Sequence, residues 1–361
     1  MYCDKLNRLS IELTQLSSGI AVVFAAEKDF DYGALQVVLK ETKITVVGAL
    51  FPGVIAEGQV RHSGFVLKHF DSSFDLQLCD SKKVIQEFSR NNISAGTGII
   101  LMDALSQGNQ AFLNTVFYEL GKDFKFIGGG AGSLELVQKP CVFDKDGIYI
   151  DKAIILLLQE KVAIGVKHGY TRMAGPFVAT RTEGNKIVEL NWENPYEVYS
   201  NIVNQDSSIP ISKEDFLSVS KGYPIGLSSK GHEDIVRDLI SVDPAGSIYS
   251  IDAVPENAAL YVLKGDKTKL IEAASSSCIE ALSQLTDEHE PSHCLIIDCV
   301  SRELFLGDDF GKEIKIASDT LTKRFKNMQI EGVLSMGEVS TFKNGRLEIY
   351  NKTFLTTLLY V

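Results

Sequence analysis

The sequence predicts an α/β protein built from repeated strand–helix–strand units. Continuous apolar runs, typical of buried strands, occur at residues 20–25, 99–102 and 294–297. Each run is followed by a stretch with helical spacing of apolar residues and then by a second apolar run. This alternation is typical of parallel sheets with right-handed crossovers.

Each unit can be placed along the chain. In the first, a strand at 20–25 precedes a helix at 32–40 and a strand at 44–47. The second has a strand at 99–102, a helix at 109–120 and a strand at 124–127. The third has a strand at 294–297, a helix at 310–328 and a strand at 330–334. Its helix carries Ile314, Ala317, Leu321 and Phe325, a spacing that places them on one face.

A glycine-bracketed turn follows the second strand of every unit, at residues 48–53, 128–132 and 332–337. A pair of strands follows each turn, and two of these hairpins carry the turn signals Asp146-Gly147 and Asn344-Gly345. These features indicate a weak internal repeat with copies that begin near residues 20, 98 and 294. The three turns would then approach one another. The alternative is a coincidence between common strand–helix–strand pieces.

A β-rich insert separates the second and third copies. We expect strands at 162–170, 177–181 and 186–190, with a tight turn at Glu183-Gly184-Asn185 and a helix at 195–202. The polar segment 204–210 is the best domain boundary, which gives two domains, 1–205 and 206–361. After it we expect strands at 247–251 and 258–264 and a helix at 267–284.

Composition restricts the classes of function. The 361 residues are 45% hydrophobic and carry a formal net charge of −11, which excludes intrinsic disorder. The acidity argues against nucleic-acid partners and against an anionic membrane. Residues 206–290 hold 15 acidic and 7 basic side chains, which indicates a solvated acidic surface or, alternatively, a surface for a basic partner.

The remaining composition favours a cytoplasmic protein. Six scattered cysteines do not form a disulfide framework, and the first residues contain no apolar signal segment. The longest aliphatic run, residues 153–158, is far shorter than the ~20 residues that span a bilayer.

The second glycine turn, Gly128-Gly129-Gly130-Ala131-Gly132-Ser133, is the first candidate site. It lacks the Lys-Ser/Thr of a phosphate-binding loop, and no helix begins at Ser133, so nucleotide binding is disfavoured. The glycines either permit close backbone packing or expose N–H groups to a small polar pocket.

A metal site near His289, His293, Cys294 and Cys299 is disfavoured. The two cysteines are an odd number of residues apart on a strand, so their side chains point to opposite faces, and no further ligand pair follows. Buried structural cysteines are the better interpretation, while Cys299 with a distant histidine stays open as a nucleophile.

Arg302 and Glu338 form the one candidate charged pair. Arg302 follows the first strand of the third unit and Glu338 ends its glycine turn, where ligands of α/β folds bind. They are either a structural ion pair or a clamp for a zwitterion, with Arg302 binding a carboxylate and Glu338 an amine.

The chain resembles the FIST family over nearly its whole length, from about residue 20 to the end. Phe126-Ile-Gly-Gly-Gly-Ala-Gly-Ser133, Val142-Phe143 and Thr180…Gly184-Asn185…Val188-Glu189-Leu190 are similar to the FIST N-terminal domain. Cys299-Val-Ser-Arg302, Gly332-Val-Leu-Ser-Met-Gly337-Glu338 and Tyr350-Asn351-Lys-Thr353 are similar to the C-terminal domain, whose most specific motif is the G-x-x-x-x-G-E turn. The resemblance implies a signal-transduction input domain for small ligands such as amino acids. Some members are haem-binding nitric-oxide sensors paired with histidine kinases.

This chain departs from the family pattern in two turns. The first turn, Ala49-Leu-Phe-Pro-Gly-Val54, is entirely apolar, and the second ends in Ser133 where an Asp is common. Only the third keeps its acidic residue, so we expect a ligand site to depend on the C-terminal half.

We therefore expect a cytoplasmic, non-enzymatic sensor without a cofactor, which binds a small polar ligand between its two domains and signals to a separate partner such as a histidine kinase. The expected ligand-binding residues are Gly128, Gly129, Gly130, Gly132, Ser133, Cys299, Arg302, Ser335, Gly337, Glu338 and Asn351. One alternative is a haem-binding nitric-oxide sensor with His168 as axial ligand. The other is an enzyme that acts on a small amino or keto acid through Cys299 or Glu338.

Overall fold

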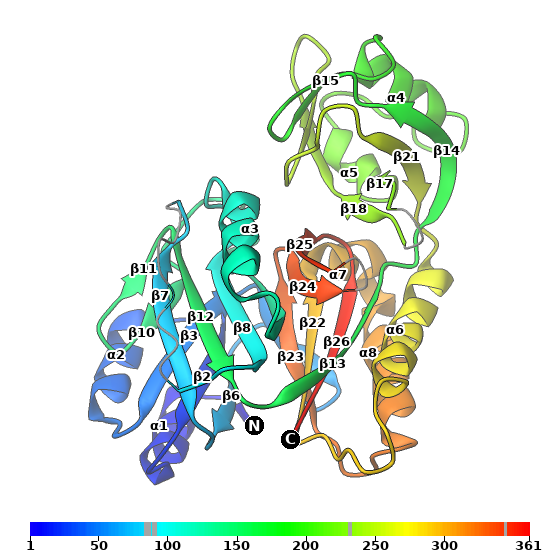
Figure 1. Cartoon of the computed structure of the whole chain (residues 1–361). Coiled ribbons are helices and arrows are strands. Elements are labelled where there is room, and N and C mark those ends of the chain that lie inside the picture. The colour runs from blue at the N-terminus through cyan, green and yellow to red at the C-terminus, as the bar shows by residue number, and fades with distance from the viewer. Residues whose placement is uncertain (83–87, 89–91, 230–232, 343–344) are drawn as a thin grey trace.

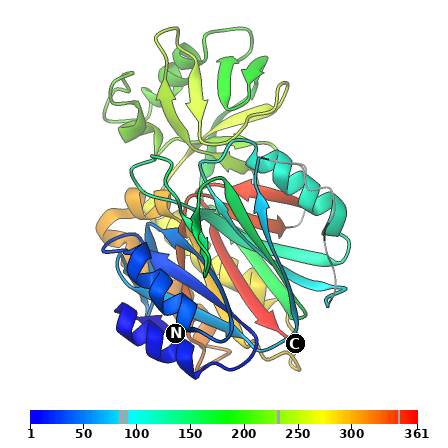
Figure 2. The same cartoon turned by 90° about the vertical axis from the view of Figure 1, so that its left-hand side faces the viewer.

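In the computed structural model, which describes residues 1–82, 88, 92–229, 233–342 and 345–361, the strands form five sheets. Three six-stranded sheets build a body, and two four-stranded sheets build an insert that stands above it (Figure 1 and Figure 2). This arrangement confirms the mixed α/β class that the sequence predicts.

The three sheets of the body follow one plan. The first has the order β1 (Tyr2–Cys3), β6 (Phe65–Phe70), β2 (Ile20–Ala26), β3 (Thr45–Phe51), β10 (Val142–Asp144) and β11 (Ile148–Tyr149). The second has the order β7 (Phe74–Asp80), β12 (Lys152–Leu158), β8 (Gly96–Asp103), β9 (Phe124–Ala131), β24 (Glu338–Phe342) and β25 (Arg346–Tyr350). The third has the order β13 (Lys161–Lys167), β26 (Phe354–Tyr360), β22 (His293–Cys299), β23 (Ile330–Ser335), β4 (Gly53–Ala56) and β5 (Gln59–Arg61).

A parallel pair lies at the centre of each of the three body sheets: β2 with β3, β8 with β9, and β22 with β23. These are the three strand–helix–strand units of the sequence. The hairpin after each pair leaves its own sheet and extends another. Thus β4 pairs with β23, β10 with β3, and β24 with β9. The three copies therefore exchange hairpins in a cycle, and each sheet is completed by a distant part of the chain.

The helices of the units cross over between their parallel strands. They are α2 (Tyr32–Glu41), α3 (Asn109–Leu120) and α8 (Phe310–Thr322), the last preceded by α7 (Val300–Leu306) and the short helix η1 (Gly307–Asp309). The side chain of Asp31 caps α2 by accepting from the N–H of Ala34. Two further helices, α1 (Leu6–Gln15) and α6 (Lys267–Leu282), precede β2 and β22.

One glycine is equivalent in the three copies and explains why each turn begins with this residue. A Cβ atom on Gly48, Gly128 or Gly332 would lie only 2.1, 1.8 or 1.9 Å from the carbonyl oxygen of the neighbouring parallel strand, at Val23, Ile100 and Ile296 respectively. A side chain at these positions would push the two parallel strands apart. The glycines thus permit the close approach of the two backbones.

Replacing Gly332 with alanine is expected to destabilise the protein by roughly 2–3 kcal/mol, because the new methyl group meets main-chain atoms that have little room to move. The measurement is urea unfolding followed by circular dichroism. Gly311 in α8 is the matched control, since a Cβ there meets nothing within 4 Å and alanine favours helix. Equal stability of the Gly332→Ala and Gly311→Ala variants would contradict the packing argument.

The insert joins the body between β13 and α6. Its first sheet has the order β14 (Thr171–Val178), β21 (Ala259–Lys264), β17 (Ile225–Leu227) and β18 (Ile235–Arg237). Its second has the order β15 (Arg181–Glu183), β16 (Lys186–Glu189), β20 (Ile248–Ser250) and β19 (Leu239–Val242). The helices α4 (Pro195–Val203) and α5 (Phe216–Ser220) pack on these strands. The resulting hydrophobic core contains only residues of the insert.

The predicted boundary at residue 206 lies inside the insert, between Val203 and Ile211, which both belong to its core. Whether the parts before and after residue 206 fold as separate domains stays a prediction. The turn at Asp146-Gly147 is confirmed, since the N–H of Asp144 donates to the carbonyl of Gly147. Asn344 of the other predicted turn lies outside the described residues.

The third predicted helix is shorter than expected. It was predicted at 310–328 but ends at Thr322, and Phe325 packs from the following segment on the hydrophobic core that α8 also contacts. Among the helices of the described residues, none is long and apolar enough to cross a membrane.

Candidate functional site

The three glycine turns meet where the parallel pairs end, as the repeat predicts. The N–H of Gly130 donates to the carbonyl of Gly337 at 2.8 Å, and the N–H of Met336 donates to the carbonyl of Gly130 at 2.9 Å. The N–H of Gly132 donates to the carbonyl of Leu50 in the first turn, also at 2.9 Å. These N–H groups therefore bind the main chain of the other turns.

Most of the predicted glycine site is structural in this arrangement. Gly128 and Gly129 lie in the interior of β9, where Gly129 is opposite Glu338 of β24. Ser133 donates a short hydrogen bond to the carboxylate of Glu27 and lies at the end of the turn. Ligand binding by these glycines stays a prediction.

Glu338 is the buried acid of the junction. It accepts from the hydroxyl of Ser335 at 2.6 Å and from the hydroxyl and N–H of Thr353 at 2.7 and 3.1 Å. Burial raises the pKa of Glu338 to about 7, although these hydrogen bonds and one from Cys299 favour the charged form. The chain therefore holds a carboxyl group that titrates near neutral pH in its interior.

The repeat shows that the two other turns fold without an acid at the equivalent position. The residues that pair with the position after the shared glycine are Val142 in the first sheet, Val54 in the third and Glu338 in the second. Two of three equivalent positions thus carry valine. Glu338 departs from the repeat at the position where the turns meet.

Cys299 does not have the properties of a nucleophile. The thiol is buried beside Ser301, with 3.1 Å between the sulfur and the hydroxyl oxygen. Burial and the nearby carboxylate of Glu338 raise the pKa of Cys299, so the reactive thiolate is disfavoured. The enzyme alternative therefore gains no support from this residue.

Arg302 does not pair with Glu338, which corrects the expectation of an ion pair or clamp between them. Its fully buried guanidinium donates to the carboxylate of Glu313, through Nε at 3.1 Å and through Nη2 in a shorter contact. Its other donors reach the carbonyl oxygens of His168, Lys352 and Leu270 at 2.7–2.9 Å. All five N–H groups are used inside the protein, so a role of Arg302 in binding a ligand carboxylate stays untested and would require breaking these bonds.

The turn that contains Asn351, Lys352 and Thr353 connects Glu338 to the insert. The amide of Asn351 donates to Asp252 at 2.9 Å. Lys352 is completely buried, pairs with Asp238 at 2.9 Å and donates to the carbonyl of Lys221 at 3.1 Å. The next residue, Thr353, binds Glu338. This turn is thus a polar contact between the centre of the body and the insert.

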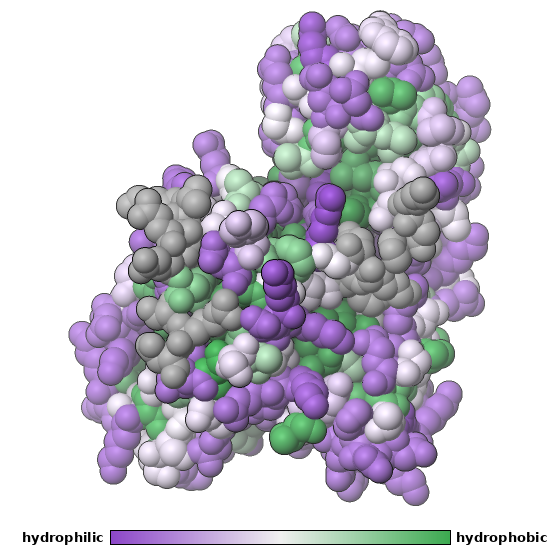
Figure 3. Space-filling view, in the orientation of Figure 1, coloured by the Kyte–Doolittle hydropathy of each residue, from purple (hydrophilic) through white to green (hydrophobic). Residues whose placement is uncertain are grey.

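A groove of about 1280 Å³ lies between the insert and the α3 side of the body. Figure 3 shows the recess below the insert, with hydrophilic side chains along its rim. On the body it is lined by Gln110, Asn114 and Phe117 of α3 and by Arg346 and Glu348 of β25, and on the insert by Leu227, Ser228 and Arg237. None of the eleven sequence-predicted residues is among the described residues that line it.

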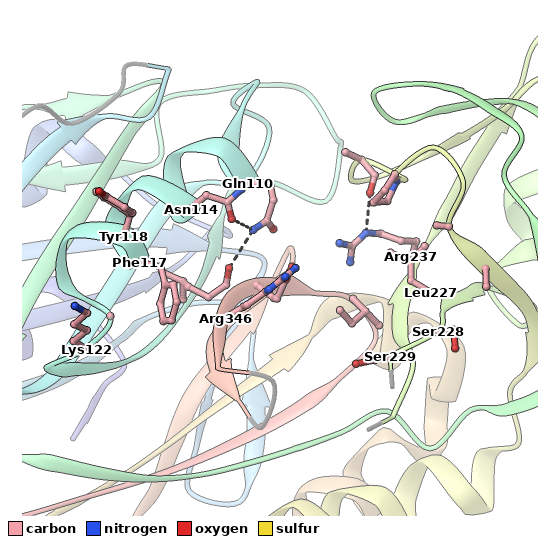
Figure 4. Close-up of a pocket in the computed structure, with 18 residues that line it drawn as sticks. Gln110, Asn114, Phe117, Tyr118, Lys122, Leu227, Ser228, Ser229, Arg237 and Arg346 are labelled. Carbon is pink, nitrogen blue, oxygen red and sulfur yellow. Dashed lines mark hydrogen bonds between the residues drawn. The ribbon is translucent and has the colours of Figure 1, made fainter. Parts of the chain in front are cut away.

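Arg237 crosses from the insert to the body beside this groove. Its Nη1 donates to the carbonyl of Ile349 in β25 at 3.0 Å, while its Nε donates to Ala253 of the insert at 3.2 Å. Figure 4 shows Arg346 between the α3 wall and the insert wall, on the side that Arg237 faces. Burial raises the pKa of Glu348, and the two arginines oppose that rise. The groove therefore holds two guanidinium groups and one carboxyl group close together.

The residues present do not fit a haem. His168 is 6% exposed, and its Nδ1 accepts from the N–H of Tyr170 at 2.9 Å, so the ring is fixed inside the linker between β13 and the insert. Burial lowers the pKa of His168 to about 4. The described lining of the groove includes neither histidine, cysteine nor methionine. Within the described part of the chain, no cluster of three or more acidic, histidine or cysteine side chains could hold a metal ion.

Comparison with protein families identifies the two halves of the chain. Residues 19–193 match the FIST N domain and residues 195–341 match the FIST C domain. The chain belongs to the FIST family. FIST domains are a sensory domain family in signal transduction, and the two matches cover most of this FIST protein. No protein with a curated description matches the chain.

The sequence could not have shown the groove of this FIST protein. Its polar residues come from α3, β18 and β25, which are far apart in the chain. The one local signal is that Arg346 and Glu348 are two residues apart on β25, which places both side chains on the same face of the strand.

Proposed function

We propose that this FIST protein is a sensor that binds a small organic acid, such as an amino acid, in the groove between insert and body and signals to a separate partner protein. The observation that carries the proposal is the position of the groove between two units that have separate hydrophobic cores. A ligand that contacts both walls of the groove would shift the position of the insert relative to the body.

The charges of the groove favour an amino acid. A carboxylate can be bound by Arg346 and by the edge of Arg237, since guanidinium groups bind carboxylates through paired N–H donors. Glu348 lies near both arginines and can accept from an ammonium group. Phe117 and Leu227 offer apolar surface to a side chain on opposite walls. This assigns to the groove the zwitterion chemistry that the sequence suggested for Arg302 and Glu338.

The insert is attached in a way that allows it to move as a unit. Two linkers join it to the body, and each contains a glycine, Gly169 after β13 and Gly265 after β21. Gly169 has a φ of +77°, a conformation that few other residues adopt without strain. The contacts of Lys352 with Asp238 and of Asn351 with Asp252 hold the present arrangement. Ligand binding would shift the balance between this arrangement and a second one.

The test is a calorimetric and thermal-shift screen of the full chain against the twenty amino acids and simple keto acids. We expect at least one amino acid to bind and to raise the melting temperature of the wild type.

Arg346→Ala should weaken binding about tenfold or more without lowering the stability of the free protein, because Arg346 is exposed. Arg181→Ala, an exposed arginine of β15 outside the groove, is the control and should bind normally. Binding that is unchanged in Arg346→Ala would place the site elsewhere.

A further inference from the structure

The turn between β16 and α4 presents a tryptophan that the fold does not use. Trp192 is the only tryptophan of the chain, and it is 80% exposed. Burying a tryptophan contributes strongly to binding because the ring is large and stiff, and such rings are enriched where binding energy is concentrated. Its exposure therefore requires a reason beyond packing.

The backbone holds this side chain outward. The N–H groups of Leu190 and Glu193 each donate to the carbonyl of the other residue, at 3.1 and 2.9 Å. The N–H of Trp192 donates to the hydroxyl of Thr180 at 3.0 Å, and Asn191 exchanges two hydrogen bonds with Val178. Five hydrogen bonds thus fix a turn of four residues, so that little entropy would be lost when the ring is bound.

The conformation of the turn makes tryptophan a poor choice for stability. Asn191 and Trp192 are its two central residues and both have positive φ, +51° and +64°. Turns of this type favour Asn followed by Gly, since a bulky side chain at positive φ is strained. The chain therefore keeps an exposed, strained tryptophan where glycine would be more stable.

Two exposed carboxylates follow the ring along the chain, Glu193 in the same turn and Glu197 in the first turn of α4. The segment 187–212 contains four acidic residues and is bordered by Lys186 and Lys213. The nearest arginine in the sequence, Arg181, is paired with Glu189 at 3.3 Å. Figure 1 shows α4 on the side of the insert away from the body, so a partner could reach it without covering the groove.

We propose that Trp192, with Glu193 and Glu197, is a docking site for a partner protein whose surface has an apolar pocket bordered by lysine or arginine. The ring would fill the pocket, and the two carboxylates would attract the basic rim and speed association. The same charge disfavours an anionic membrane as the occupant. This inference does not depend on the ligand groove.

Trp192 supplies its own signal for the test, because all tryptophan fluorescence of the chain comes from it. The probe is a helical peptide of leucine and lysine with one apolar and one basic face, compared with the same peptide in which glutamate replaces lysine. We expect the basic peptide to shift the emission to shorter wavelengths and the acidic peptide to leave it unchanged. No shift with the basic peptide, or an equal shift with neutral lipid vesicles, would overturn the proposal.

Variants separate docking from folding. Trp192→Gly should keep or slightly raise the melting temperature, since glycine suits the turn, and should weaken binding of a labelled basic peptide by about tenfold. Glu193→Gln/Glu197→Gln should reduce the salt dependence of binding. Val37→Ala, which truncates an exposed apolar residue of α2 on the body, is the control and should bind as the wild type does. A clear loss of thermal stability in Trp192→Gly, or its normal binding of the peptide, would show that the ring is not a docking residue.

Discussion

Replacing Arg302 with alanine is expected to destabilise the protein by about 4 kcal/mol or more, and the variant should be largely unfolded at moderate urea concentrations. The substitution removes five hydrogen bonds from a completely buried side chain. It also leaves the carboxylate of Glu313 in the interior without its cation. Unpaired buried charges are among the most costly defects a fold can carry.

Two further variants test this explanation. Arg302→Lys keeps the charge but has no planar fork of donors, so it should recover only part of the lost stability. Arg302→Ala/Glu313→Gln removes the carboxylate that Arg302 binds most closely, while Asp298, 3.4 Å from Nε of Arg302, remains. The double variant should therefore be more stable than Arg302→Ala alone. Urea unfolding of the three variants gives the comparison. An unfolding free energy of Arg302→Ala close to that of the wild type would contradict the structural role and would return Arg302 to the ligand site.

The parts of the fold that could be predicted are those encoded by neighbouring residues. The helix at 109–120 was predicted with its observed bounds because Phe112, Val116 and Leu120 mark one face within a single segment. The parallel pairs could be predicted from their continuous apolar strands, which are buried on both faces. The shared glycine could be recognised because a glycine follows the second strand of each unit, and the structure adds the close contact that explains it.

The exchange of hairpins could not be predicted, because the pattern of a strand does not specify its partner. Glu338 pairs with Gly129 from a distant part of the sequence, and Leu334 pairs with Gly53. In each case the alternation of side chains is compatible with several sheets. Only the packing of the whole body decides among them.

The error at Arg302 has a similar cause. The sequence showed a basic residue after a strand and an acidic residue in a nearby turn, and both do lie near the ends of β22 and β23. The partners that Arg302 has instead come from α8, which brings Glu313 to the guanidinium, and from the linker that brings the carbonyl of His168. Neither contact has a local signal, because the partners are separated in the chain and one of them is main chain.

The stability of the protein should depend on pH through Glu338. The pKa of this carboxyl is about 7 in the folded protein against 4.5 for an ordinary glutamate. Between these two values the folded protein keeps a proton that the unfolded chain releases, so the free energy of unfolding falls as the pH rises. The contribution is fully present below pH 4.5 and is lost by about pH 7, and it amounts to roughly 3 kcal/mol.

Glu338→Gln removes the titration of this acid. Burial also raises the pKa of Asp298 and Glu313, and both residues remain in the variant; the charge of Glu338 is only one of the smaller causes that raise the pKa of Asp298. The glutamine can accept from Thr353 and donate to Ser335, so the packing of the turns is kept. We therefore expect the difference in unfolding free energy, variant minus wild type, to increase from pH 5 to pH 8 by roughly 2–3 kcal/mol.

The measurement is urea unfolding of both proteins at several pH values in this range. Glu57→Gln, which changes an exposed carboxylate on the body, is the control and should follow the pH profile of the wild type. A profile for Glu338→Gln parallel to that of the wild type would mean that Glu338 does not titrate near neutral pH. If the difference does increase, Thr353 links that titration to Lys352 and Asp238, so protonation of Glu338 should also change how firmly the insert is held.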